Sequence, residues 1–291
     1  MTNELPTASQ IKLITTDIDG TLLNPKGKIS EKTKLIIKKV LEKYPDLHFV
    51  LASSRARPAT KDIRNELGIS ERPNTESILC NGCVIYDSVG NILWQNIIPI
   101  GFITEFHDIV KNHTPDNYMY SSGDDAYMFD ENWGKKAHDK YQENIILIDK
   151  EEYIKKVKSG ESKVNRVCFM VKSKDEVEEI KKKFENIRNK YHLECVYFPN
   201  IFLDYMPNQT NKGTGIKQLI KLLNISKDEV LAFGDGNNDI ELLKNVGWPV
   251  AMANATDQLK SHAKIITQSN AEDGLANLLE NIFLKKDEHI N

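Results

Sequence analysis

The sequence predicts an α/β fold, with a doubly wound, mostly parallel, Rossmann-like core sheet and an inserted α+β domain. Short apolar runs alternate with helical patterns near both ends of the chain, and such alternation indicates a parallel sheet. Between about residues 100 and 205, aromatic-rich strand candidates and highly charged helices replace this pattern. The 291 residues suffice for about two domains. We therefore predict a core formed by residues 1–99 and 206–291, interrupted by an insert over residues 100–205.

The first third predicts strand, helix, strand and helix, followed by short strands. Ser30 is a suitable N-cap for a helix whose apolar residues, from Leu35 to Leu41, fall at helical spacing. A second helix is predicted from near Pro58 to Gly68, with proline early and glycine just past the end. The predicted strands of this part are residues 11–14, 47–51, 77–80, 84–86 and 92–99.

In the last third of the chain, predicted strands and helices alternate again, whereas in the insert they do not. Helices are predicted over 213–223 and near 240–243, and strands at 230–233 and 249–252. We interpret the charged segment 175–190 of the insert as a helix with a solvated face rather than as an anion-binding patch. The strand candidates of the insert are residues 144–148, 164–171, 193–198 and 202–205.

Composition and charge narrow the class of protein. Hydrophobic residues make up 40% and charged residues 28%, as in a soluble globular protein. The net charge of -3 gives no broad attraction to nucleic acid or to an anionic membrane. No run approaches the ~20 apolar residues of a membrane helix, and the polar first ten residues lack a signal-peptide core. Because four cysteines in such a chain argue for a reducing compartment, we expect a cytoplasmic protein without nucleic-acid or membrane partners.

The CxxC spacing of Cys80 and Cys83 invites a zinc or redox interpretation. A structural zinc site needs four ligands, whereas Cys168 and Cys195 stand far off and alone. A redox pair is expected at the start of a helix, but this pair lies between strand-like segments. We therefore predict small buried thiols beside a turn.

Four short polar segments stand out, and three of them follow predicted strands. Ligands bind at the carboxyl ends of the strands in an open parallel sheet. We therefore expect these three segments to meet at one edge, while the segment around Lys212 opens a helix. The segments are Asp17-Ile18-Asp19-Gly20-Thr21, Ala52-Ser53-Ser54-Arg55, Asn211-Lys212-Gly213 and Gly234-Asp235-Gly236-Asn237-Asn238-Asp239.

These residue types suit phosphoryl transfer. Of the two carboxylates Asp17 and Asp19, one can attack phosphorus and the other can protonate the leaving oxygen and then activate water. Lys212, near the start of its helix, supplies positive charge to the phosphoryl group. Asp235, with Asp239, can hold Mg²⁺, which prefers oxygen ligands, and Ser53 can bind phosphate oxygens.

Two other interpretations of the Gly234 segment fail. A dinucleotide-binding loop needs a third glycine, which is missing after Gly236. A calcium loop that begins at Asp235 needs glycine at its sixth position and glutamate at its twelfth, where this chain has Ile240 and Val246.

The whole chain resembles the haloacid dehalogenase superfamily phosphatases of the Cof type, which carry a large α/β cap between their second and third motifs. Asp17 to Thr21 match the family's DxDGT motif, and Ser53 matches the hydroxyl residue of the second motif. Lys212 matches the third motif, and Gly234, Asp235, Asn238 and Asp239 match GDxxND. Further matches to the family are Asn81-Gly82, Ala-Met-Ala-Asn-Ala at 251–255 and Glu-Asp-Gly at 272–274.

The resemblance implies a role for each matched residue. Asp17 would be the nucleophile and Asp19 the acid and base, with Ser53 and Lys212 completing the catalytic set. Phosphate would be bound by Gly20, Ser53, Ser54, Arg55, Lys212 and Asn238. The cofactor Mg²⁺ would be held by Asp17, Asp19, Asp235 and Asp239. The chain departs from the family pattern at Ser54, where glycine is usual, and at Cys83, where alanine is frequent.

Within the superfamily that the chain resembles, the ion-pumping ATPases have threonine at the position of Asp19 and the dehalogenases lack an acid there. The resemblance therefore favours a phosphatase or a phosphomutase, which must protonate a leaving alkoxide and then activate the second nucleophile. We therefore expect a Mg²⁺-dependent phosphomonoesterase that acts on small phosphorylated metabolites, with sugar phosphates preferred, and whose insert closes as a lid. The alternatives are a phosphohexomutase-like enzyme and a non-catalytic sensor of phosphorylated metabolites. In the insert, Arg166 and Asp204 are candidate specificity residues, although we favour a structural role for both. The sequence specifies neither the substrate nor the oligomeric state.

Overall fold

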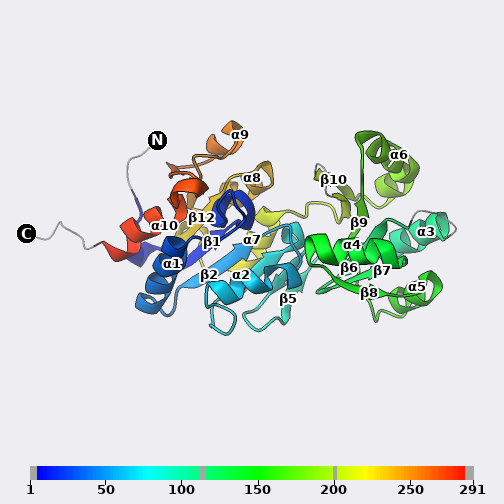
Figure 1. Ribbon diagram of the computed structural model, residues 1–291, viewed down its shortest axis with the longest axis horizontal. Coiled ribbons are helices and arrows are strands. Elements are labelled where there is room, and N and C mark those ends of the chain that lie inside the picture. The colour runs from blue at the N-terminus through cyan, green and yellow to red at the C-terminus, as the bar shows by residue number, and fades with distance from the viewer. Residues whose placement is uncertain (1–4, 112–115, 199–201, 286–291) are drawn as a thin grey trace, which may run out of the picture. The chain divides into compact units, whose positions relative to one another are not determined.

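The computed structural model describes residues 5–111, 116–198 and 202–285 (Figure 1). The chain forms two compact units. The first, which we call the core unit, consists of Met1–Ser54, Lys61–Trp94 and Asn211–Asn291. The second, which we call the cap unit, consists of Arg55–Thr60 and Gln95–Thr210. Each unit has its own sheet and its own hydrophobic clusters, so each is described by itself.

An eight-stranded sheet in the order β14-β13-β12-β1-β2-β3-β4-β5 organises the core unit. Neighbouring strands from β14 to β3 run parallel, and β4 is antiparallel to β3. Thr16, at the end of β1, pairs with Phe233 on one side and Leu51 on the other. The strands are β1 (Leu13–Thr16), β2 (His48–Ala52), β3 (Ser77–Leu79), β4 (Val84–Tyr86), β5 (Ile92–Gln95), β12 (Val230–Gly234), β13 (Trp248–Ala251) and β14 (Ile265–Ile266).

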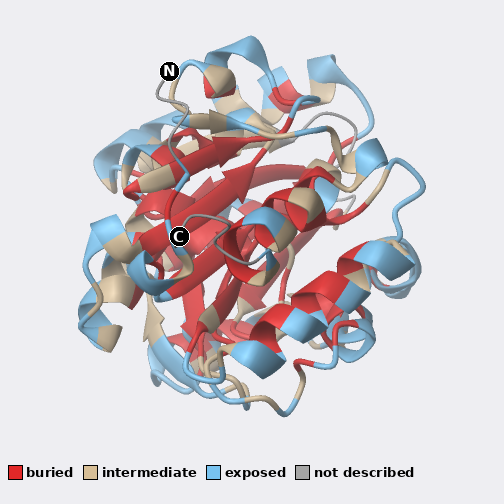
Figure 2. Ribbon diagram, turned by 90° about the vertical axis from the view of Figure 1, so that its left-hand side faces the viewer, coloured by how far each residue is buried: buried red, intermediate tan, exposed pale blue. Residues whose placement is uncertain are grey.

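Helices cover both faces of this sheet, because successive side chains along a strand point to opposite faces. Ile14 belongs to a hydrophobic cluster with α1 and α10, whereas its neighbour Leu13 belongs to a second cluster with α7 and α8. In Figure 2 the buried strands lie among helices whose outer surfaces are exposed. These helices are α1 (Glu31–Lys43), α2 (Lys61–Glu66), α7 (Lys212–Leu223), α8 (Ile240–Lys244), α9 (Asp257–Lys260) and α10 (Gly274–Leu279). The predicted doubly wound core is confirmed.

Local signals in the sequence explain where several of these elements begin and end. Ser30 caps α1, as predicted, because its side chain accepts a hydrogen bond of 3.0 Å from the N–H of Thr33. The segment predicted as a helix from Pro58 instead begins with a 3₁₀ turn, Pro58–Thr60, before α2. Strand β3 ends at Leu79, one residue earlier than predicted, because Cys80 already has a positive φ of 51°.

The cap unit contains a separate six-stranded mixed sheet in the order β10-β11-β9-β6-β7-β8. Its pairs are antiparallel except β7 with β8, which is parallel. The predicted strands of the insert correspond to β8 (Asn144–Leu147), β9 (Arg166–Met170), β10 (Glu194–Phe198) and β11 (Phe202–Met206). The sheet also contains two strands outside that prediction, β6 (Tyr118–Ser122) and β7 (Asp125–Met128). The predicted α+β character of the insert is confirmed.

Helices also lie on both faces of the cap sheet. On one face, α3 (Ile100–Val110), α5 (Lys150–Lys158) and α6 (Lys174–Lys190) share an aromatic cluster with Tyr120 and Phe169. On the other face, α4 (Glu131–Tyr141) packs with Met119 and Cys168. Within the aromatic cluster, the Phe106 ring meets the Tyr120 ring edge to face and stacks on the Phe184 ring.

Two features bear on the class of protein. All four cysteines are free thiols, and Cys80, Cys83 and Cys168 are buried, as predicted for the CxxC pair. Among the residues that the structure describes, no helix has both the length and the apolar character needed to cross a bilayer.

Candidate active site

Three predicted site segments follow neighbouring strands of the core sheet. Asp17 comes directly after β1, and its N–H donates to the carbonyl of Phe233 in β12 at 3.0 Å. Ser53 comes directly after β2, and its N–H donates to the carbonyl of Ile78 in β3 at 2.9 Å. Asp235 follows β12. Because β12, β1 and β2 are adjacent and parallel, these residues share one edge of the sheet.

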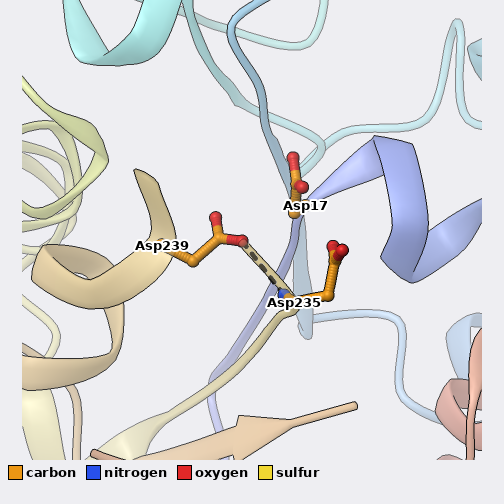
Figure 3. Close-up of side chains that lie close together, drawn as sticks. All are labelled: Asp17, Asp235 and Asp239. Atoms are coloured by element: carbon orange, nitrogen blue, oxygen red, sulfur yellow. Dashed lines mark hydrogen bonds between the residues drawn. The ribbon is translucent and has the colours of Figure 1, made fainter. Parts of the chain in front are cut away.

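Three carboxylates converge at this edge (Figure 3). Asp17, Asp235 and Asp239 each offer one oxygen, and these oxygens lie within 4.8 Å of one another. Asp239 is fully buried, and its Oδ2 accepts hydrogen bonds of 3.1 Å from the N–H groups of Asp235 and Gly236. A Cβ on Gly234 would lie 2.6 Å from the Cβ of Asp239, so glycine is required there. The backbone of residues 234–236 therefore holds the Asp239 side chain in place.

Lys212 is fully buried and joins two of these carboxylates. Its Nζ lies 2.6 Å from Oδ1 of Asp17 and 2.6 Å from Oδ1 of Asp239. It is the first residue of α7, whose N-cap Asn211 accepts a hydrogen bond from the N–H of Thr214. A side chain on Gly82 would overlap the carbonyl oxygen of Asn211. The predicted Asn81-Gly82 pair thus lets the chain pack closely against the start of α7.

When its three carboxylates are all ionised, the site carries more negative than positive charge. Burial, reinforced by Asp239, raises the pKa of Asp17 to about 8, although Lys212 acts in the opposite direction. Burial also raises the pKa of Asp235 to about 6, with a smaller contribution from Asp239, while a hydrogen bond from Thr21 opposes the rise. Burial lowers the pKa of Lys212, but Asp17 and Asp239 together raise it above its usual value. Three carboxylates thus face one lysine. A divalent cation would compensate the excess negative charge, and clustered carboxylate oxygens are ligands that Mg²⁺ accepts.

The turn after β1 is fitted to Asp235. Thr21 Oγ1 donates to Oδ1 of Asp235 at 2.7 Å. Gly20 has a φ of 85°, and a Cβ at this position would overlap the Asp235 carboxylate. Asn254, to which the sequence analysis gave no role of its own, donates from Nδ2 to the carbonyl of Gly20 at 2.8 Å. Only the match of residues 251–255 to a family pattern pointed towards Asn254.

The remaining predicted residues are arranged less tightly. Asp19 is exposed on the turn after β1, and its carboxylate lies outside the cluster of three. Ser53 is buried, and its carbonyl accepts a hydrogen bond from the N–H of Asn81 at 2.9 Å. Asn238 lies half-buried in the turn before Asp239. Ser54 is half-buried at the end of this segment of the core unit, whereas Arg55 belongs to the cap unit and donates to the carbonyl of Ala59.

In the cap unit, Arg166 and Asp204 form part of a buried ionic cluster. Arg166 donates to Glu143 at 3.0 Å and to Asp204 at 3.3 Å, and all three side chains are at most 4% exposed. This burial supports the structural role that we favoured for Arg166 and Asp204.

Comparison with known proteins identifies the family. The sequence model of a family described as haloacid dehalogenase-like hydrolase matches residues 14–279. The chain belongs to this family. The resemblance to Cof-type phosphatases of the haloacid dehalogenase (HAD) superfamily is therefore confirmed.

Similar sequences and solved structures agree with this result. An uncharacterized hydrolase of Schizosaccharomyces pombe is 30% identical over 97% of this chain and 94% of its own. The 5-amino-6-(5-phospho-D-ribitylamino)uracil phosphatase of Bacillus subtilis is 26% identical over 94% of this chain and 96% of its own. A HAD/COF-like hydrolase structure from Plasmodium vivax has a TM-score of 0.74, with 27% identity over 94% of this chain and 96% of its own. The protein is thus a HAD-type phosphatase, which hydrolyses phosphomonoesters of small metabolites.

Proposed function

We propose that this HAD phosphatase depends on Mg²⁺ and hydrolyses sugar phosphates through an aspartyl-phosphate on Asp17. The observation that carries the proposal is the contact of Lys212 with Asp17 and Asp239 at 2.6 Å each, beside a third carboxylate. A lysine that is buried among carboxylates, at the carboxyl ends of the parallel strands, suits the binding and transfer of a dianionic phosphoryl group. The preference for sugar phosphates is supported by the Bacillus subtilis relative, whose named substrate carries its phosphate on a ribityl chain.

In the first step, a carboxylate oxygen of Asp17 forms a bond to phosphorus, and the bond from phosphorus to the ester oxygen breaks. Asp19 donates a proton to the departing alkoxide, so that the sugar leaves as an alcohol. In the second step, Asp19 takes a proton from water as the water oxygen attacks phosphorus. The aspartyl bond breaks, which releases inorganic phosphate and restores the Asp17 carboxylate. The exposure of Asp19 is compatible with both proton transfers.

The other proposed residues hold the phosphoryl group. Lys212 neutralises part of the charge of the phosphoryl group. The phosphoryl oxygens accept hydrogen bonds from the hydroxyl of Ser53 and from the main-chain N–H groups of Gly20 and Ser54. Arg55 and Asn238 complete the proposed set of phosphate-binding residues. When bound, Mg²⁺ would neutralise further charge and orient the phosphoryl group. Its proposed ligands are the carboxylates of Asp17 and Asp235 and the main-chain carbonyl of Asp19, with Asp239 beside them.

We further propose that residues 100–205 recognise the part of the substrate that is not phosphate. The core unit supplies all the acids and the lysine of the proposed chemistry. Its small polar groups suit phosphate but offer little to distinguish one alcohol from another. Specificity for a metabolite therefore requires further side chains.

A screen for phosphate release tests this function. Purified protein is incubated with Mg²⁺ and a panel of sugar phosphates, pyridoxal phosphate and nucleoside monophosphates, and inorganic phosphate is measured. We expect one or a few sugar phosphates to be hydrolysed with the highest kcat/KM. Transfer of the phosphoryl group to an added sugar, in place of phosphate release, would indicate a phosphohexomutase-like enzyme. Binding of phosphorylated ligands without any turnover would indicate a sensor.

A further inference from the structure

The cap unit contains a cavity of about 370 Å³, which is lined by residues of this unit alone. One wall is formed by α4 and the other by the end of β9 and the two residues that follow it (α4 and β9 are labelled in Figure 1). The lining combines aromatic and aliphatic surface with charged groups. The lining residues are Trp133, Lys136, Asp139, Lys140, Tyr141, Met170, Val171 and Lys172.

The spacing of residues on α4 brings two of its lysines and its tryptophan to one face. Trp133, Lys136 and Lys140 stand at positions i, i+3 and i+7, which lie on the same side of an α-helix. Nζ of Lys136 lies 4.3 Å from the centre of the Trp133 ring, and Nζ of Lys172, from the opposite wall, lies 5.1 Å from it. Nζ of Lys140 lies 5.1 Å from the centre of the Tyr141 ring. Three ammonium groups are therefore held against two aromatic rings.

These lysines differ from three other lysines of the cap unit, which are paired with acids. Lys111, Lys150 and Lys190 form ion pairs with aspartate or glutamate at 2.5–3.1 Å. In the part of the chain that the structure describes, no carboxylate lies within 4.0 Å of the ammonium groups of Lys136, Lys140 and Lys172. A contact with an aromatic face orients an ammonium group without using all of its N–H donors. With three lysines against one aspartate, the lining carries a net positive charge.

Residues of both walls make contacts with other parts of the cap unit, and these contacts hold the walls in position. The N–H of Lys172 donates to Oε2 of Glu176 at 2.7 Å, while Asn117 Nδ2 donates to the carbonyl of Met170 at 2.9 Å. On the side of α4, the Tyr141 ring packs on Phe202, with ring centres 4.5 Å apart. Met170 and Val171 are both less than 10% exposed. The walls are therefore parts of the folded cap, and little reorganisation is required for a ligand to bind.

We propose that this cavity binds a small organic phosphate through residues of the cap unit alone. The phosphate would accept charge-assisted hydrogen bonds from Lys136, Lys140 and Lys172. The carbon part would lie against Tyr141, Met170 and the edge of Trp133, where it removes apolar surface from water. This site does not depend on the proposed catalytic mechanism, because none of its residues takes part in it.

Fluorescence of Trp133 provides a local signal for binding. Trp133 is the only tryptophan between residues 95 and 210, so the difference between the wild type and Trp133→Phe isolates its emission. Phenylphosphonate, which cannot be hydrolysed, and inorganic phosphate are titrated as probes, with benzyl alcohol as the uncharged control. We expect a saturable change with phenylphosphonate, weaker binding of phosphate and no change with benzyl alcohol.

The variant Lys136→Gln/Lys172→Gln tests the role of the lysines, and circular dichroism checks that it is folded. We expect phenylphosphonate to bind at least ~10-fold more weakly, because two charge-assisted contacts are lost. The matched control Lys155→Gln/Lys182→Gln removes the same charge from exposed positions outside the cavity, and its affinity should stay within about twofold of the wild type. Unchanged affinity in the first variant, an equal loss in the control, or equal affinity for the two anionic probes would overturn the proposal.

Discussion

Lys212 forms ion pairs with two buried carboxylates, those of Asp17 and Asp239. It lies 2.6 Å from an oxygen of Asp17 and from an oxygen of Asp239, and it has no exposed surface. Removing one partner from a buried ion pair typically costs about 3–5 kcal/mol, because the other charge remains buried alone. The same lysine therefore supports the fold of the core unit and, in the proposed mechanism, the charge of the phosphoryl group.

The first prediction at the residue scale concerns the nucleophile. Asp17→Asn keeps the size of the side chain and an oxygen that can accept from Lys212, but it removes the attacking charge. Turnover should fall by ~10³-fold or more while the protein remains folded. Rapid quenching with substrate labelled on phosphorus should find label on the wild type and none on the variant. Near-normal turnover by the folded variant would contradict the role given to Asp17.

The second prediction concerns the metal. Chelation should abolish phosphate release and added Mg²⁺ should restore it, because the excess of carboxylates would otherwise repel the phosphate dianion. Ca²⁺ should inhibit, since it takes more ligands than Mg²⁺ and would bind the Asp17 carboxylate through both oxygens. Activity is measured after metal removal has been verified by elemental analysis. Full activity in the metal-free protein would exclude this view of the site.

At the scale of the element, tight turns place the site residues. The turn after β1 brings Gly20 against Asp235, and the turn after β3 brings Gly82 against the start of α7. Both glycines have a positive φ, of 85° and 97°. The strands alone would not set the geometry, because the polar residues lie just beyond the strand ends.

Two glycines in the same loop allow a matched test of this idea. Gly20→Ala combines a strained φ with overlap of the Asp235 carboxylate, so it should lower kcat/KM by ~10²-fold or more. Gly27 also has a positive φ, of 71°, but a Cβ there would meet nothing within 4 Å. Gly27→Ala should therefore lose only about 1 kcal/mol of stability and keep its activity. Steady-state kinetics and urea unfolding measure both effects, and equal activity of the two variants would refute the argument.

The buried ionic cluster of Glu143, Arg166 and Asp204 predicts a dependence of stability on pH. Burial raises the pKa of both Glu143 and Asp204, although Arg166 opposes the rise. The folded state therefore binds more protons than the unfolded state above the ordinary carboxyl pKa, and stability falls as pH rises from there through the raised values.

Asp204→Asn removes one of these two carboxylates and should weaken that dependence. The variant resembles protonated Asp204, so relative to the wild type its free energy of unfolding should increase between about pH 4 and pH 7. Urea unfolding of both proteins across this range measures the difference. A difference that stays constant with pH would mean that Asp204 does not titrate in the folded cap unit.

For the whole molecule, local sequence signals predicted the core better than the cap. Strand ends that carry Asp17, Ser53 and Asp235 followed from apolar runs and from the rule that parallel strands end together. Strands β6 and β7, which lie within an aromatic-rich segment of the insert, were not predicted. The contact of Asn254 with Gly20 could not be read from the sequence, since it joins residues 234 positions apart. Contacts of this kind depend on the assembled fold rather than on any local pattern.

The last prediction separates chemistry from specificity. Among the described residues, two large hydrophobic clusters of the core unit draw on residues of that unit alone, so the core has the means to fold without the insert. Replacing residues 100–205 with a short flexible linker should abolish or strongly impair turnover of the natural substrate, because the side chains proposed to recognise its alcohol part are lost. Much of the activity on para-nitrophenyl phosphate should remain, since that small ester needs only the phosphate-binding residues and the acids. Circular dichroism and Mg²⁺ binding verify the folded core. If both activities were lost equally in a folded, Mg²⁺-binding core, the insert would contribute to catalysis itself, and the division of labour proposed for the two units would be wrong.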